Sequence, residues 1–144
     1  MANSKVRQFN FKNIGDIKGP VINLDFSGKD IVEMPIFYRE EGSNPEGHFH
    51  KGIDKSFDPQ FVYVLKGRME FSCMYPNGDS ETLIIQEMQG IELPKFVYHR
   101  YKTLEYTIFC EPRLEKYDLN INDKIICSAT DYPEIISEIL KDEK

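Results

Sequence analysis

The chain has 144 residues, a length typical of one domain with its own core. It is 40% hydrophobic and 29% charged, as globular proteins usually are, and its formal charge is −6 at pH 7. This acidic balance argues against a nucleic-acid partner, and no stretch resembles a signal peptide or reaches the roughly 20 apolar residues of a membrane span.

Most of the chain follows the period-two pattern of β-strands. Strands are predicted, in chain order, at Val21–Leu24, Ile31–Arg39, His48–Lys51, Gln60–Lys66, Met69–Met74, Glu81–Gln86, Ile91–Leu93, Val97–Lys102 and Tyr106–Glu111. The segment Gln60–Lys66 is the clearest, because it is rich in aromatic and β-branched residues. Pro35 interrupts the second of these strands, which we therefore expect at a sheet edge or with a bulge.

The period changes near the C-terminal end. The segment 131–134 offers an N-cap aspartate, an early proline and a first-turn glutamate. Apolar residues then follow at helical spacing, at Ile135, Ile136, Ile139 and Leu140. We predict a helix at about residues 132–141 on an all-β sandwich or barrel, with residues 1–144 forming a single domain.

Three cysteines, Cys73, Cys110 and Cys127, lie far apart in the sequence. An odd, scattered set favours reduced thiols in the cytoplasm over a disulfide framework. We expect a cytoplasmic protein in which each thiol is a small core or near-core residue.

The histidines are the candidate functional residues. His48 and His50 are two residues apart on a predicted strand, so their side chains point to the same face. His99, on another predicted strand, can complete a set of three neutral nitrogen donors of the kind found in Fe, Ni, Mn or Zn sites. The same residues also fit a metal-free acid–base pocket or a structural role in the core.

With the histidines on these strands, the chain resembles the cupin superfamily over about residues 30–111. The residues that carry the resemblance are Gly47, His48, His50, Gln60 and Gly67 for the first motif and Pro94 and His99 for the second. Phe96 and Thr103 depart from the second motif, and nine residues separate His50 from Gln60, which is more than the motif has. The resemblance implies a cupin double-stranded β-helix (jelly-roll) barrel with a short C-terminal helix.

The resemblance also implies one divalent transition metal, Fe, Ni, Mn or Zn, held by His48, His50, Gln60 and His99. Asp54 and Asp58, in the enlarged loop 52–59, remain open as alternatives to Gln60 as the fourth ligand. A glutamine leaves nearly the full charge of the ion uncompensated, which favours Lewis-acid chemistry. The activity implied is isomerisation, epimerisation or elimination (a lyase reaction) on a small carbohydrate-like keto or uronate substrate.

In such a barrel, Val62, Val64 and Phe96 are expected to form an apolar wall against the substrate. Tyr101 shares the strand parity of His99, so it is a further candidate catalytic group.

A metal-free alternative comes from the nucleotide-diphospho-4-keto-sugar 3,4-ketoisomerases and related epimerases, whose layout residues 36–50 resemble. That resemblance implies His48 or His50 as base, Tyr38 as the partner acid and Arg39 on a phosphate. Residues 9–12 resemble a strand of that branch that dimers often exchange, so we expect a homodimer. Further alternatives are a three-histidine iron dioxygenase and a non-catalytic small-molecule-binding barrel.

Overall fold

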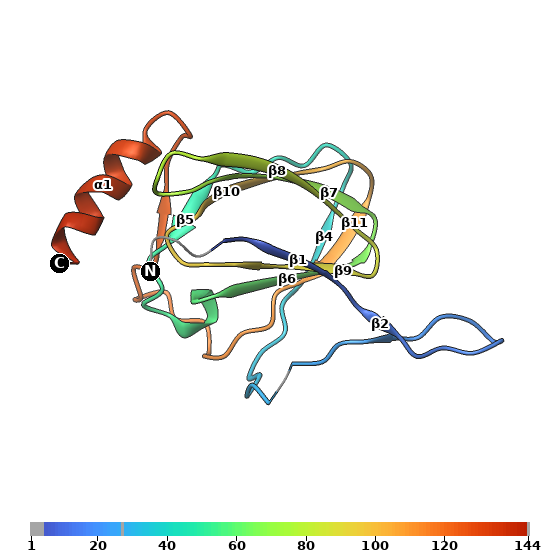
Figure 1. Ribbon diagram of the computed structural model, residues 1–144. Coiled ribbons are helices and arrows are strands. Elements are labelled where there is room, and N and C mark those ends of the chain that lie inside the picture. Colours follow the sequence, from blue (N-terminus) through green and yellow to red (C-terminus); the bar gives the residue numbers. More distant parts are fainter. Residues whose placement is uncertain (1–4, 27, 144) are drawn as a thin grey trace.

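The computed structural model describes residues 5–26 and 28–143, which form a barrel of two five-stranded β-sheets (Figure 1). The first sheet, in spatial order, is β1 (Arg7–Asn10), β9 (Gln89–Leu93), β6 (Gln60–Lys66), β11 (Thr107–Cys110) and β4 (Ile36–Arg39). The second is β12 (Lys124–Ile126), β5 (His48–His50), β10 (Tyr98–Thr103), β7 (Arg68–Met74) and β8 (Ser80–Gln86). The antiparallel strands pass repeatedly between the sheets, which is the predicted jelly-roll arrangement.

The strand predictions are largely confirmed. β6 has the predicted bounds, and the ends of β7 to β11 lie within two residues of prediction. The strand expected at Ile31–Arg39 is shortened to Ile36–Arg39, because Pro35 has no N–H to continue the ladder. The short strand β12 was not predicted.

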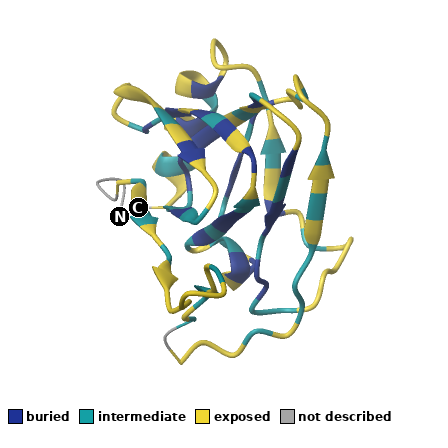
Figure 2. Cartoon of the chain, turned by 90° about the vertical axis from the view of Figure 1, so that its right-hand side faces the viewer, coloured by how far each residue is buried: buried dark blue, intermediate teal, exposed yellow. Residues whose placement is uncertain are grey.

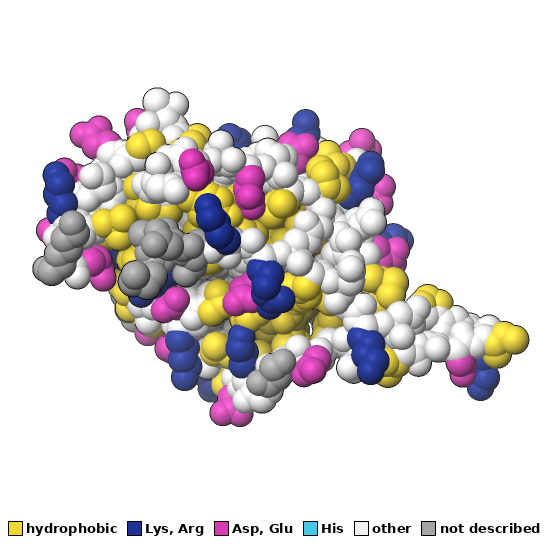
Figure 3. Space-filling view, viewed as in Figure 1, with side chains coloured by type: hydrophobic (Ala, Val, Ile, Leu, Met, Phe, Trp, Pro, Cys, Tyr) yellow, Lys and Arg dark blue, Asp and Glu magenta, His cyan; other side chains and the backbone are white. Residues whose placement is uncertain are grey.

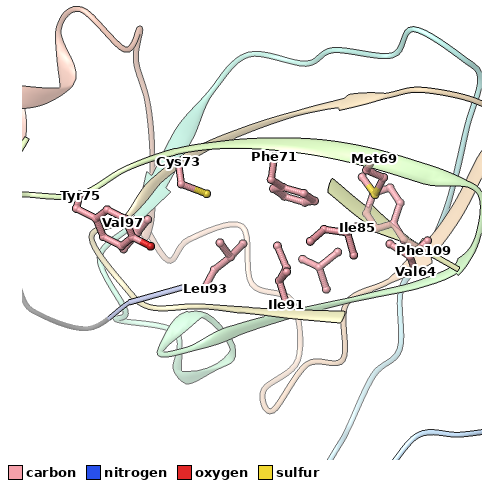
Figure 4. Close-up of a cluster of buried hydrophobic side chains, with 11 residues drawn as sticks. Val64, Met69, Phe71, Cys73, Tyr75, Ile85, Ile91, Leu93, Val97 and Phe109 are labelled. Atoms are coloured by element: carbon pink, nitrogen blue, oxygen red, sulfur yellow. The ribbon is translucent and has the colours of Figure 1, made fainter. Parts of the chain in front are cut away.

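Apolar side chains from the inner faces of both sheets fill the space between them. Figure 4 shows these side chains pointing toward one another from the facing walls. The members are Val62, Val64, Met69, Phe71, Cys73, Tyr75, Ile85, Ile91, Leu93, Val97 and Phe109. Buried and exposed residues alternate along β7 and at the end of β8, as the period-two pattern requires. Figure 2 shows buried and exposed positions side by side along the strands of the barrel.

The C-terminal helix α1 (Tyr132–Asp142) confirms the prediction and covers the outer face of the second sheet. Tyr132 and Ile136 pack against Phe49, Phe96 and Tyr98 in a second buried cluster. The Tyr132 hydroxyl also donates a hydrogen bond to the backbone carbonyl of Phe96. Within the described ranges, no helix has both the length and the apolar character needed to cross a bilayer.

A hairpin projects from the barrel between β2 (Lys12–Asn13) and β3 (Ile22–Asn23) (Figure 1). Ile17 near its tip is 101% exposed, and Ile14 and Val21 are about half exposed. The space-filling view shows apolar side chains at the end of this projection (Figure 3). The hairpin therefore presents apolar surface beyond the body of the molecule.

The three cysteines are free thiols, as expected for core or near-core residues. Burial raises the pKa of Cys73 to about 12 and that of Cys110 to about 11, so both are protonated at neutral pH. Cys127 is partly buried. The cytoplasmic location remains a prediction.

We expect Tyr132→Ala to lower the free energy of unfolding by about 3 to 5 kcal/mol, because it removes a fully buried aromatic ring and its hydrogen bond. Urea unfolding followed by circular dichroism measures the change. Tyr38→Ala is the matched control, since Tyr38 is 59% exposed and should change stability little. Equal losses in the two variants would contradict the packing role of α1.

Candidate functional site

The alternation of β5 and its pairing with β10 bring the three histidines together. His48 and His50 point to the inner face, and His99 lies directly opposite His48 in the ladder. The ring centroid of His48 lies 4.9 Å from that of His50 and 4.5 Å from that of His99. One ring nitrogen from each residue lies within 4.8 Å of the others, so the nitrogens face a common point.

A hydrogen bond holds each imidazole. His50 Nδ1 lies 2.9 Å from Asp123 Oδ2, and His99 Nδ1 lies 3.1 Å from the Val97 carbonyl oxygen. The His48 ring bonds to the backbone of Glu46. Since a neutral imidazole donates through one nitrogen, its second nitrogen keeps a lone pair for a ligand or a proton.

Burial favours the neutral form of all three rings. Desolvation, aided by the charge of His50, lowers the pKa of His48 to about 3. Burial also lowers the pKa of His50, although Asp123 acts in the opposite direction. The pKa of fully buried His99 lies well below its usual value for the same reason.

Asp123, which sequence reasoning missed, anchors this arrangement. Besides His50, its carboxylate accepts the backbone N–H groups of Ile53 at 2.6 Å and Asp54 at 3.1 Å. Burial alone would raise the pKa of Asp123, but these hydrogen bonds outweigh it and hold the pKa below its usual value. No local sequence pattern signals this role, because Asp123 meets His50 only through the pairing of β12 with β5.

The histidines open into a cavity of about 600 Å³. The first sheet contributes Phe37, Arg39, Gln60, Val62 and Phe109, and the second contributes His48, His50, Phe71, His99 and Tyr101. Glu111, which directly follows β11, also lines the cavity. The rest of the lining comes from Glu33, Pro35, Pro45 and parts of segments 54–57 and 112–124. The cavity thus joins an apolar interior to a polar group of imidazoles, carboxylates and guanidinium groups, as small-molecule sites commonly do.

Three of the predicted pocket residues lie in this cavity beside the histidines. Val62 lines its apolar wall, and Arg39 Nε donates a hydrogen bond to the Tyr101 hydroxyl at 3.1 Å. Because the hydroxyl oxygen accepts this bond, the Tyr101 O–H remains able to donate to a bound molecule.

Three other predicted pocket residues lie elsewhere. Tyr38 is exposed, because it alternates with the inward-facing Phe37 and Arg39 on β4. Val64 belongs to the closed core beyond the cavity. Phe96 has a positive φ of 69° before β10 and packs under α1 on the outer face. The cavity lining therefore does not include Tyr38, Val64 or Phe96, and their expected roles in catalysis and substrate contact remain predictions.

The loop 52–59 forms a wall of the site. It contains the short helix η1 (Lys55–Phe57), and the Phe57 ring stacks on His50 with centroids 3.7 Å apart. Asp54 caps η1 through Ser56 N at 2.8 Å and forms a buried ion pair with Arg113. Asp58 lies 3.6 Å from Lys95 Nζ. Neither aspartate belongs to the described group of His48, His50 and His99, and their assignment as alternative fourth ligands remains a prediction.

Gln60 lies on the inner face of β6 and lines the cavity, as predicted, but its amide faces another side chain. Its Nε2 donates a hydrogen bond to Glu111 Oε1, and its Oε1 is buried without a hydrogen-bond partner among the described residues. Burial raises the pKa of Glu111 to about 7, although the bond from Gln60 and nearby cations oppose the shift. Glu111 was missed, yet its parity with Phe109 on the predicted strand 106–111 was an available signal.

The fold matches solved structures of sugar-modifying enzymes. The chain is similar to a 3,4-ketoisomerase from Helicobacter canadensis, with 15% identity, a TM-score of 0.72 and coverage of 92% of this chain and 97% of that chain. A sugar 3,4-ketoisomerase from Thermoanaerobacterium thermosaccharolyticum in complex with TDP has 16% identity, a TM-score of 0.73 and coverages of 93% and 96%. A dTDP-4-dehydrorhamnose 3,5-epimerase from Sulfolobus tokodaii has 15% identity, a TM-score of 0.67 and coverages of 88% and 78%.

No family model and no curated protein matches the sequence. At the identities of the structural matches, the likeness shows the fold: the chain has the cupin double-stranded β-helix, as its sequence resemblance implied.

Glu111→Gln should make stability less dependent on pH. The pKa of Glu111 rises from 4.5 to about 7 on folding, so the folded state binds more protons in this window and loses stability as pH rises through it. Glutamine removes this penalty. As the pH rises from 4 to 8, the free energy of unfolding of the variant relative to wild type should therefore increase by at most about 3 kcal/mol. Urea unfolding at both pH values measures the gain, and a constant difference would contradict the raised pKa.

Proposed function

We propose that this protein is a cupin isomerase that moves a carbonyl group between neighbouring carbons of a keto-sugar by acid–base chemistry. The observation that carries the proposal is the His50–Asp123 hydrogen bond, which faces the same cavity as the Tyr101–Arg39 pair. A fixed base and a fixed proton donor in one cavity are what this reaction requires. The sugar isomerases and epimerases that share the fold support this assignment over elimination.

The reaction starts with removal of a proton from the carbon next to the carbonyl. The free nitrogen of His50 takes this proton, and Asp123 holds the ring in the required tautomer through Nδ1. The electron pair left on carbon forms an enediolate, whose oxygen charge the Tyr101 hydroxyl and Arg39 stabilise. The proton of the neighbouring hydroxyl then moves to the former carbonyl oxygen by way of the Tyr101 hydroxyl. The proton held by His50 returns to the former carbonyl carbon, so the new carbonyl forms at the neighbouring carbon and no outside oxidant is needed.

A nucleotide-linked keto-sugar is the substrate class that we favour. Two matching structures contain TDP or TDP-4-keto-6-deoxyglucose, and the chain covers nearly all of each. In this cavity Arg113 is paired with Asp54, so Arg39 and Lys124 are the cations that we assign to the anionic part of the substrate.

Incubation with TDP-4-keto-6-deoxyglucose in D2O tests the proposal. The isomerised sugar should appear by NMR with deuterium at the carbon that receives the returned proton. Absence of both turnover and exchange would overturn the proposed reaction for this substrate class.

His50→Asn should abolish turnover, and Asp123→Asn should lower kcat by about 10²- to 10⁴-fold, because each removes the oriented base. Circular dichroism checks that the variants fold. Tyr38→Phe is the matched control and should keep wild-type kcat, since Tyr38 lies outside the cavity. Loss of activity in Tyr38→Phe would support the sequence-based role of that residue.

A second candidate function is metal-assisted isomerisation. Three converging imidazoles, each held by an acceptor outside the cluster, form a donor set that fits Fe, Ni, Mn or Zn. His48, His50 and His99 would hold the ion, with Gln60 as a possible fourth donor through its unpartnered oxygen. Such an ion supplies Lewis acidity toward a carbonyl oxygen.

Metal content separates the two candidates. If the metal-assisted function is correct, protein purified without a tag carries close to one equivalent of transition metal by mass spectrometry, and His99→Ala loses it while remaining folded. Turnover that is unaffected by a chelator, together with no uptake of added ions, would contradict it.

We also propose a homodimer as the functional form. The projecting hairpin 12–23 presents exposed Ile14 and Ile17, and a second copy of the chain would cover such apolar surface. Light scattering coupled to size exclusion distinguishes a dimer from a monomer.

A further inference from the structure

The amide oxygen of Gln60 is unusual within the described structure because it is buried without a hydrogen-bond partner. Buried polar atoms are almost always paired, since an unpaired acceptor loses its bond to water and gains nothing in return. Such an atom at a cavity wall therefore points to a donor that a bound molecule supplies.

The orientation of this oxygen is fixed. Gln60 is 5% exposed at the start of β6, where it pairs with Leu93 in the ladder. Its Nε2 is engaged with Glu111 Oε1, so the oxygen occupies the other branch of the amide. Both residues line the cavity.

No residue in the described ranges 5–26 and 28–143 donates a hydrogen bond to this oxygen. The inner faces of the neighbouring strands carry apolar side chains, including Val62 and Phe109. Three polar donors of the cavity are engaged with other groups: Arg113 with Asp54, Arg39 with Tyr101, and His50 with Asp123.

We propose that Gln60 and Glu111 form a subsite for a sugar hydroxyl that does not react. Gln60 Oε1 accepts the hydrogen of this hydroxyl, and Glu111 locks the amide in the orientation that makes the oxygen available. The inference rests on the proposed function and deepens it: the substrate must carry a free hydroxyl beside the two reacting carbons. In a 4-keto-sugar that exchanges its carbonyl between C4 and C3, the 2-hydroxyl is in that place.

Two substrates test the subsite: TDP-4-keto-6-deoxyglucose and the same compound lacking the 2-hydroxyl. Wild type should prefer the hydroxylated compound in kcat/KM by about tenfold or more, because the deoxy compound leaves the Gln60 oxygen unpaired. Gln60→Met keeps the length of the side chain without its polar atoms, so it should reduce the preference to about threefold or less. In this variant kcat/KM should decrease for the hydroxylated compound, whereas kcat/KM for the deoxy compound should change little.

Gln86→Met is the matched control, since Gln86 is an exposed residue of β8, outside the cavity lining, and should keep the wild-type preference. If Gln60→Met does not fold, Glu111→Leu provides a second test. It removes the acceptor that orients the Gln60 amide, and the preference should fall by at least about threefold.

The inference is overturned if Gln60→Met folds and keeps the full preference for the hydroxylated compound. It is also overturned if that variant loses bound transition metal while keeping the preference, because the oxygen would then be a metal ligand. Turnover of neither compound by wild type would overturn the proposed function itself, and the subsite with it.

Discussion

The register between β5 and β10 is the constraint on which the site depends. His99 lies opposite His48 in this antiparallel pair, and His50 follows on the same face of β5. A shift of one residue in either strand would turn imidazoles away from the cavity. The pairing of β10 with β7 over six residues, Tyr98–Thr103, holds β10 in place and so fixes where the imidazoles meet.

Buried polar contacts connect this sheet to the loops that close the cavity. Asp123 joins His50 to the backbone of Ile53 and Asp54, and Asp54 joins the loop 52–59 to Arg113. Because both aspartates are almost completely buried, losing one partner would leave an uncompensated charge in the interior. The loop is therefore part of the rigid wall of the cavity, and the stacking of Phe57 on His50 follows from its fixed position.

The strands and the faces of their side chains could be predicted from the sequence, because they follow from the local period of apolar residues. Contacts between segments far apart in the sequence could not. Alternation was sufficient to place β6, the shared face of His48 and His50, and the inward side of Tyr101. The same rule places Tyr38 and its neighbour Arg39 on opposite faces of β4, so the roles that the family resemblance assigned to these two residues need different faces of the strand. Asp123 could not be found this way, since it meets His50 from 73 residues away through an edge strand of only three residues.

Phe49 lies between the two imidazoles of β5 and is completely buried beneath α1. The inward and outward faces of this strand therefore cannot be interchanged by a shift in register. Substitution of a single imidazole leaves this packing intact. Insertion or deletion of one residue would instead bury an imidazole beneath Tyr132 and place the phenyl ring in the cavity. As descendants of this chain diverge, their chemistry can change by substitution at positions 48 and 50, whereas the length of the segment between Gly47 and Lys51 is expected to stay constant.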